Sequence, residues 1–481
     1  MPTAPAPPLG ESLDQAPFTK LHFRFWLLAA LGILLDGFDF FIIGVASPLL
    51  AEDFGLSDAE KGLVTAAAIV GAIFGAGLLG PLADKIGRRR IFRFDLILFI
   101  VFSLICMLAW NVWSLIAFRF VLGIAIGLDY PIAASYLAEV LPSRARGRWL
   151  VSAFSLQAIG ILMGAIVGVI VLAIVPEVTS WRWMLGFGAI PALVIVILRR
   201  GVPESPRWLA QNGREEEAAE VTEALVCHPV TVTAADRAKE EETPEGIKAL
   251  VQPRLFKRGM RRRTAFTALP WFLMDIATYG VGIFTPTLIA AIAVHGANTT
   301  FIADDIASTK ATAALDIFLP IGFAIAIYLV DRVGRVPLQI FGFAGMTVAL
   351  CLLATIELLS GGGESHLALV AIGFAIFNTC MNAGPNATTY ALPAEVFPSE
   401  VRAAGHGFAA ACAKFGAALG VFFFPILLAD IGASALLFGV AGCCLLGLTI
   451  TAALRIEPKG RTLEDLAGAE LSELAPHPVP P

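Results

Sequence analysis

Apolar runs of about 20 residues recur along almost the whole chain, and they constrain its fold more than any motif does. A helix needs about 20 apolar residues to cross a bilayer. The composition agrees, with 57% hydrophobic and 15% charged residues and a mean hydropathy of +0.78. The sequence therefore predicts an all-α membrane protein with twelve transmembrane helices, near 22–50, 60–82, 92–110, 113–139, 149–174, 182–199, 264–292, 311–330, 336–359, 366–393, 403–428 and 432–454.

Basic residues are unevenly distributed among the segments between these runs. If the N-terminus is inside, the cytosolic segments hold 29 of the 34 Lys and Arg residues, and only Arg119 and Lys414 lie within the membrane. Because cytosolic loops carry an excess of Lys and Arg, we expect both termini in the cytosol, in a bacterial cytoplasmic (inner) membrane. The tails 1–20 and 457–481 are expected to be disordered.

Two short segments occur twice, which indicates an internal repeat. Residues 138–143 recur with one substitution as residues 394–399, and Asp84-x-x-Gly87-Arg88 recurs as Asp331-x-x-Gly334-Arg335. We infer two pseudo-symmetric six-helix halves, 21–200 and 264–456, joined by a charged cytosolic linker with short helices at 201–263. Two such halves with a site between them near the bilayer midplane are the architecture of alternating access.

Trp271, Asp275 and Tyr279 lie four residues apart within one apolar run. This spacing places all three on one stripe of a helix. An ionisable group at membrane depth is costly and marks a candidate functional site. The two aromatic residues also fit ordinary packing, so Asp275 is the informative member of the three.

The segment 80–90, Gly-Pro-Leu-Ala-Asp-Lys-Ile-Gly-Arg-Arg-Arg, resembles the loop signature of the major facilitator superfamily. A weaker copy of this signature at 331–335 falls where that superfamily repeats the signature. The resemblance extends over residues 22–466. It implies the major facilitator fold. The charged residues of the repeats indicate a latch at the cytosolic face, although they also fit a role in fixing topology alone. The candidate latch residues are Asp84, Gly87, Arg88, Glu139, Arg146, Asp331, Gly334, Arg335, Glu395 and Arg402.

Within this superfamily, several motifs resemble those of phosphate:proton symporters from fungi and plants. Residues 127–131, Gly-Leu-Asp-Tyr-Pro, are similar to the fourth-helix motif of these symporters, with Leu128 where they usually have a second Gly. Residues 384–389 also match. By this resemblance, the substrate-binding residues would be Asp129, Tyr130, Gln157, Trp271, Asp275, Tyr279, Asn386 and Lys414, and the proton-coupling residues would be Asp36, Asp39, Arg119 and Asp275.

The charges within the spans support proton coupling by a separate argument. The predicted spans contain more acidic than basic side chains, so an anion would bind stably only if some carboxyls were protonated, as burial favours. Binding of protons and of the anion would then be coupled reciprocally. The acid excess also suits a cationic or zwitterionic substrate. Asp39 and Arg119 also fit a structural ion pair between helices.

Other functions stay open. Residues 203–207, Pro-Glu-Ser-Pro-Arg, resemble a motif of sugar porters, and bacterial symporters of organic acids share the same motif skeleton. A transporter scaffold can also act as a nutrient sensor without flux. An enzyme is not expected, because the sequence contains no zinc-binding His pair, nucleophile elbow or phosphate-cradling loop. We expect the protein to use no cofactor or metal and to bind no nucleic acid. We expect a monomer whose partners are a small solute, protons and the lipid bilayer.

Overall fold

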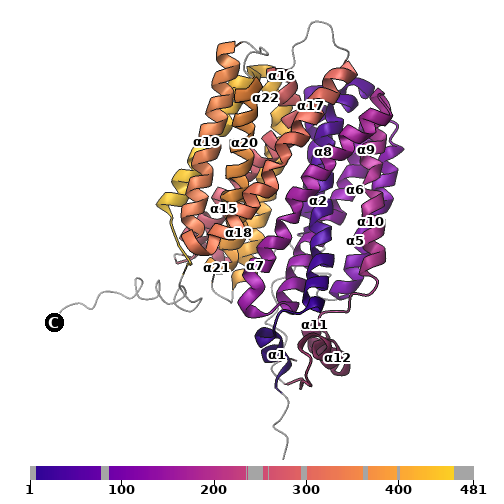
Figure 1. Ribbon diagram of the computed structural model, residues 1–481, viewed down its shortest axis with the longest axis vertical. Coiled ribbons are helices and arrows are strands. Elements are labelled where there is room, and N and C mark those ends of the chain that lie inside the picture. Colours follow the sequence, from indigo (N-terminus) through magenta and orange to yellow (C-terminus); the bar gives the residue numbers. More distant parts are fainter. Residues whose placement is uncertain are drawn as a thin grey trace, which may run out of the picture.

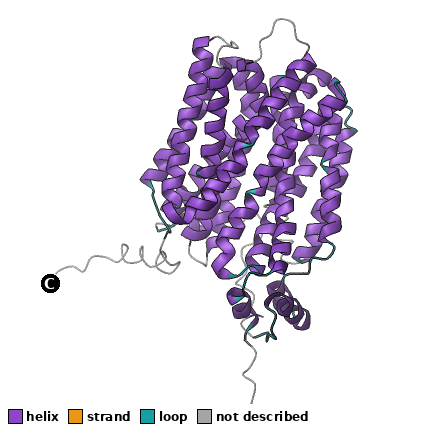
Figure 2. Ribbon diagram, viewed as in Figure 1, coloured by secondary structure: helices purple, strands orange, loops and turns teal. Residues whose placement is uncertain are grey.

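The computed structural model describes residues 7–76, 86–233, 236, 253–257, 259–293, 301–360, 367–397 and 401–459, which are almost wholly helical (Figure 2). Most of the helices run roughly parallel to one direction and form a bundle (Figure 1). The short helices α1 (Leu9–Gln15), α11 (Pro206–Gln211) and α12 (Glu215–Val226) lie beyond one end of the bundle. We call this end the linker end and the opposite end the far end.

The N-terminal half of the bundle occupies residues 20–199. Polar residues start several of its helices, because the side chains of Thr19, Ser57 and Asn111 each accept a hydrogen bond from the backbone N–H three residues later. Its helices are α2 (Lys20–Phe54), α3 (Asp58–Phe74), α5 (Arg88–Met107), α6 (Val112–Val140), α7 (Ser143–Phe154), α8 (Leu156–Ile174), α9 (Trp181–Phe187) and α10 (Ala189–Arg199), with the short turn η2 (Val178–Ser180) before α9.

The C-terminal half follows the short turn η3 (Pro253–Phe256). Its last helix is kinked at Gly432, which has a φ of 78°, and it therefore supplies two spans. Pro385 begins α21 and separates it from the helix before. The helices of this half are α15 (Arg261–Ile283), α16 (Thr285–Ala293), α17 (Phe301–Asp316), α18 (Phe318–Val333), α19 (Arg335–Ser360), α20 (Leu367–Ala383), α21 (Pro385–Val396) and α22 (Arg402–Ala453).

Consecutive short helices join into single spans in both halves. The pairs are α7–α8, α9–α10, α15–α16, α17–α18 and α20–α21. Nine segments among the described residues are long and apolar enough to cross a membrane, and the segment 405–453 contains two of the predicted spans. Together with α3 and α5, these segments confirm the predicted all-α architecture of twelve spans.

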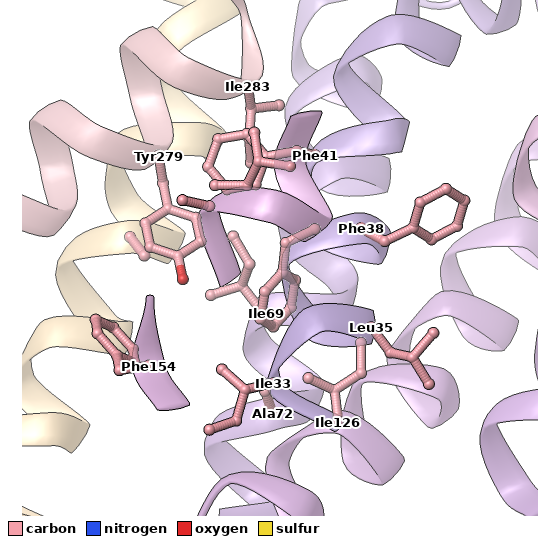
Figure 3. Close-up of a cluster of buried hydrophobic side chains, with 14 of the residues drawn as sticks. Ile33, Leu35, Phe38, Phe41, Ile69, Ala72, Ile126, Phe154, Tyr279 and Ile283 are labelled. Carbon is pink, nitrogen blue, oxygen red and sulfur yellow. The ribbon is translucent and has the colours of Figure 1, made fainter. Parts of the chain in front are cut away.

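The most extensive contacts between the two halves join α3 with α22 and α8 with α17. Smaller contacts join α2 with α15 and α16, α8 with α18, and α7 with α18 and α21. Buried apolar side chains from both halves form one continuous core across this interface, part of which is drawn in Figure 3. Any site formed between the halves is therefore enclosed by α2, α8, α15 and α22.

Two expectations about element boundaries are wrong. Residues 1–20 are not entirely disordered, because α1 is a helix whose Leu9 and Leu13 are fully buried and which packs against α12. The eighth span, expected at 311–330, begins at Phe301. Its first turns carry Asp304, Asp305 and Lys310, which lower the local hydropathy although the backbone stays helical.

Candidate functional site

Lys414 joins two residues of the sequence-predicted triplet at the interface between the halves. Its ammonium group lies 2.6 Å from the hydroxyl oxygen of Tyr279 and 3.4 Å from Oδ2 of Asp275. Asp275 is 2% exposed, and its carboxyl also interacts with Trp271. Gln157 of α8, in the other half, interacts with Tyr279. The structure therefore brings five predicted residues from both halves into one cluster.

Aromatic rings of α2 cover this cluster. Phe40 and Phe41 lie 5.9 Å and 5.6 Å from the ring of Tyr279, measured between ring centroids. The ammonium of Lys414 is 4.4 Å from the ring centroid of Tyr279, within range of a cation–π interaction. In Figure 3, Phe41 and Ile283 lie together on one side of Tyr279, whose hydroxyl points the other way. Apolar side chains thus close one side of the site.

A second aromatic group crosses between the halves beside Trp271. Phe154 of α7 stacks on Tyr390 of α21 at 4.7 Å, and Trp271 meets Tyr390 edge-on at 6.3 Å. His406 packs edge-on against both Trp271 and Tyr390. Trp271 also contacts the carboxyl of Asp275. We call the group formed by Phe154, Trp271, Tyr390 and His406 the aromatic floor.

Asp129 forms an ion pair that the sequence reasoning missed. Arg199 Nη1 lies 3.0 Å from Oδ1 of Asp129, and both side chains are buried. Arg199 also donates hydrogen bonds to the backbone carbonyls of Leu28 and Ala29, at 2.8 Å and 3.2 Å. The sequence predicted only Arg119 and Lys414 within the membrane, whereas the structure also places the guanidinium of Arg199 inside the bundle.

A further acid, Asp95 of α5, lies beside this pair and was also missed. It is 2% exposed, and its carboxyl interacts with that of Asp129. Asp36, Asp95 and Asp129 line one small cavity. Asp95 stands only three residues into its apolar run, so the sequence offered no signal that it faces inward.

Asp36 connects the acidic cavity with the lysine site. It is 3% exposed, and its carboxyl interacts electrostatically with Asp129 on one side and with Lys414 on the other. Asp39, one turn along α2, pairs with the fully buried Arg119 at 3.2 Å. The structure thus brings together the predicted proton-coupling acids, and it leaves the role of the Asp39–Arg119 pair as a prediction.

Asn386 belongs to a row of buried amides. Its Nδ2 donates to Oδ1 of Asn382 at 2.8 Å, and Asn382 donates to the backbone oxygen of Asn378 at 2.9 Å. Asn378 donates in turn to the carbonyl of Leu315 in α17 at 3.1 Å. Asp316 follows Leu315 directly and is 7% exposed. The side chain of the remaining candidate, Tyr130, lies outside the described residues.

Candidate latch residues form matching ion pairs at the linker end of each half. Arg88 lies 3.0 Å from Glu139, and Arg335 contacts Glu395 through two hydrogen bonds of 2.8 Å and 2.9 Å. Asp331 also pairs with Arg335, at 3.0 Å. Asp84 and the side chains of Arg146 and Arg402 lie outside the described residues.

Two glutamates missed by the sequence reasoning cap the helices of the latch. Glu204 accepts hydrogen bonds from the backbone N–H groups of Arg88 and Arg89, at 2.9 Å and 3.2 Å. Glu457 accepts from those of Arg335 and Val336, at 3.1 Å and 2.8 Å. A carboxylate at a helix N-terminus complements its unpaired N–H groups and its dipole. Each glutamate follows the last predicted span of its half, a shared position that the sequence shows, although it does not show which helix each one caps.

Gly87 and Gly334 make room for these caps. Both have left-handed φ values, 102° and 108°, that favour glycine. A Cβ at Gly87 would lie 2.4 Å from Oε2 of Glu204, and one at Gly334 would lie 2.9 Å from Oε2 of Glu457. The repeated Gly-Arg pair therefore combines a turn, a capped helix start and an ion pair.

A family model described as "Sugar (and other) transporter" matches residues 25–469. This match covers most of the chain and both halves of the bundle. The chain belongs to this family, within the major facilitator superfamily. It is accordingly a multi-pass membrane transporter, as the sequence predicted.

Two relatives of this transporter cover nearly the full length. Inorganic phosphate transporter 1-1 of Oryza sativa subsp. japonica is 32% identical, over 94% of this chain and 95% of its own length. A protein of Escherichia coli K12 named for metabolite transport, YaaU, is 31% identical, over 94% of this chain and 96% of its own length.

Solved structures agree on the fold of the transporter. The xylose transporter XylE from Escherichia coli, in a partially occluded inward-open conformation, superposes with a TM-score of 0.74. The alignment covers 92% of this chain and 100% of XylE, with 21% sequence identity. The predicted major facilitator fold is confirmed.

Proposed function

We propose that this transporter carries inorganic phosphate together with protons by alternating access. The observation that carries the proposal is the ammonium of Lys414, held at the interface between the halves by Asp275 and Tyr279. A lysine ammonium is a compact charge suited to a phosphate oxygen. The 32% identity to a rice protein named as an inorganic phosphate transporter supports the same substrate.

Protonation of Asp275 is the proposed coupling step. Oδ2 of Asp275 lies 3.4 Å from the ammonium of Lys414, which the carboxyl attracts when it is ionised. A proton taken up by Asp275 removes this attraction, so that Lys414 can turn toward a phosphate oxygen while the neutral acid donates a hydrogen bond to another. A phosphate anion and a proton therefore stabilise each other in the site.

The remaining candidates take supporting roles in this proposal. Gln157, Trp271 and Tyr279 shape the pocket around the anion, and Tyr130 and Asn386 complete it. Asp129 with Arg199 forms the wall of the N-terminal half. Protons reach the site through Asp36 and Asp39, whose neighbour Arg119 holds Asp39 in place.

The orientation proposed for the chain follows from its basic residues. The linker end carries the latch pairs and α11–α12, so we place this end in the cytosol with both termini. The membrane is then the bacterial cytoplasmic (inner) membrane, and the protein acts as a monomer. The latch pairs at Arg88 and Arg335 must loosen when the cytosolic side opens.

Uptake by purified protein in proteoliposomes tests the proposal. We expect radioactive phosphate to accumulate when the outside is acidic, with proton entry that depends on phosphate. In Asp275→Asn, which stays neutral, accumulation driven by the proton gradient is expected to disappear while phosphate exchange across the membrane persists. Asp430→Asn, an exposed acid of the same half, should behave as wild type.

Other outcomes would redirect the proposal. The relative named for metabolite transport favours a small organic acid as the second candidate. Proton-dependent uptake of a carboxylate or a sugar, with none of phosphate, would replace the substrate. Phosphate binding without any flux would indicate a sensor. Concentrative phosphate uptake by Asp275→Asn at the wild-type rate would remove Asp275 from coupling.

A further inference from the structure

Asp305, near the beginning of α17, is a buried acid that the proposed transport site does not use. Its side chain is 4% exposed, and neither carboxyl oxygen has a hydrogen-bond partner among the described residues. The hydroxyl of Thr309, one turn later, is fully buried and equally without a partner there. A buried carboxylate without partners is costly, because ionisation needs water, hydrogen bonds or an opposite charge.

Asp305 begins a polar stripe along α17. The other members, Ser308, Thr309, Thr312 and Asp316, follow at helical spacing, and all are buried. α17 packs against α8 of the N-terminal half. A Cβ placed on Gly168 of α8 would lie 3.3 Å from the side chain of Thr309. The stripe is therefore covered by the opposite half. α17 begins at the far end of the bundle (Figure 1), and Asp305 lies near this beginning, four residues after Phe301.

Titratable groups around Asp305 are sparse. α8 (Leu156–Ile174) and α16 (Thr285–Ala293) contain none, and α20 contributes only Cys380. The nearby end of α2 carries Glu52 and Asp53, of which Asp53 accepts a hydrogen bond from Trp181 and pairs with Arg182.

The helix α17 itself adds few charges. It carries Asp304 and the exposed Lys310 in the turns beside Asp305, and the buried Asp316 at its other end. The only basic side chain of this helix therefore points to the surface, away from the covered stripe. A base that would hold Asp305 ionised is absent from the described parts of these elements.

We propose that Asp305 is a protonation site of the α8–α17 interface that controls closure of the far end. When the halves close there, the carboxyl takes up a proton from the solution on that side. When they part, water reaches the carboxyl, which releases the proton to the same solution. This proton is not transported. The inference rests on alternating access between the halves and not on the identity of the substrate.

The proposal predicts that acid at the far end favours closure. Because one proton is bound by the closed form and not by the open form, the ratio of open to closed molecules rises by up to about tenfold per pH unit while Asp305 titrates. Asparagine has nearly the shape of a protonated aspartic acid and cannot ionise. Asp305→Asn should therefore favour the closed form to the same extent at all pH values, without a change in the number of protons moved per substrate.

Distances between spin labels test this directly. Ile174, at the end of α8, is 74% exposed, and Phe301, at the start of α17, is 42% exposed. Ile174→Cys and Phe301→Cys are combined in full-length protein whose native cysteines have been replaced, and a spin label is attached to each. The labelled protein is placed in lipid nanodiscs without substrate. With Asp305 present, we expect the population of molecules with the longer distance between the two labels to grow as the pH rises from about 5 to about 9. Buried carboxyls titrate in this range.

Matched variants complete the experiment. Asp305→Asn and Asp305→Ser should both lose the pH response, so that a folding defect of one does not decide the outcome. Asp304→Asn removes the neighbouring acid, which is only partly buried, and should keep the response. Sodium is replaced by choline in a parallel series.

Three results would overturn the proposal. The first is an unchanged distance distribution across the pH range with Asp305 present. The second is a full pH response in both neutral variants. The third is a shift that follows sodium at constant pH, which would make the stripe a cation site. A change in the measured proton stoichiometry in Asp305→Asn would show that its proton is transported and would overturn the distinction drawn above.

Discussion

At the scale of single residues, each half of the bundle holds a buried carboxyl with a long basic side chain. Arg199 reaches Asp129 and two backbone carbonyls, so its guanidinium is fixed by three groups. Lys414 has a different setting, because among the described residues its ammonium donates hydrogen bonds only to Asp275 and Tyr279, and the side chain stays partly exposed. The lysine is therefore the partner that can exchange a carboxylate for an anion, whereas the arginine stabilises the wall of the site.

The fit of the Asp129–Arg199 pair depends on Gly32 of α2. A Cβ at this position would lie 1.6 Å from Oδ2 of Asp129 and 2.6 Å from Nη2 of Arg199. We expect Gly32→Ala to destabilise the protein by about 1–3 kcal/mol, the usual cost of overpacking. Thermal unfolding in detergent measures this. Gly407→Ala, a helical position with open space around it, serves as the control, and equal unfolding temperatures of the two variants would contradict the argument.

Sequence reasoning found residues at this scale where the spacing was informative. The interval of four between Trp271, Asp275 and Tyr279 predicted a shared stripe, and the structure places Asp275 and Tyr279 at Lys414 and Trp271 beside Asp275. Arg199 and Asp95 were missed because both stand at the ends of apolar runs. At such positions hydropathy cannot tell a side chain that points into the bundle from one that points to water.

At the scale of elements, the linker end repeats one construction in both halves. A glycine with a left-handed φ precedes α5 and α19, an arginine of the first turn pairs with a glutamate, and a second glutamate caps the helix. The sequence repeat singled out the glycine, the arginine and the first glutamate as candidate latch residues, but not which glutamate pairs with which arginine. The caps, Glu204 and Glu457, come from segments distant in the chain, so only the folded structure shows what they contact.

These caps can be tested separately from the latch. Glu204→Gln and Glu457→Gln each keep the size of the side chain but remove the charge that faces the helix dipole. We expect each to lower the free energy of unfolding by about 0.5–2 kcal/mol, the range for helix caps and dipole interactions. Chemical denaturation followed by circular dichroism gives the value. The exposed Glu220→Gln is the control, and a loss no larger than in that control would show that the caps are not stabilising.

At the scale of the whole molecule, the two halves enclose the site from different sides with aromatic side chains. Phe40 and Phe41 pack on Tyr279, and the aromatic floor of Phe154, Tyr390, Trp271 and His406 spans the halves next to Asp275. The apolar runs and the repeat predicted two halves. They did not predict which aromatics meet across the interface, because such contacts depend on how the halves dock rather than on patterns within one helix.

Removal of the Phe154 ring should weaken closure at the linker end. Its stack on Tyr390 joins the halves at 4.7 Å, and an aromatic pair contributes about 0.5–1.5 kcal/mol beyond its buried area, or about two- to tenfold in a conformational ratio. We expect Phe154→Ala to increase the open population at this end, measured between spin labels at Phe23→Cys and Val333→Cys. Phe438→Ala, which removes a partly exposed ring elsewhere, should leave the distances unchanged. Closure at one end accompanies opening at the other, so the distance between the far-end labels at positions 174 and 301 should change in the opposite direction. Unchanged distances at both ends would exclude a role for the stack in gating.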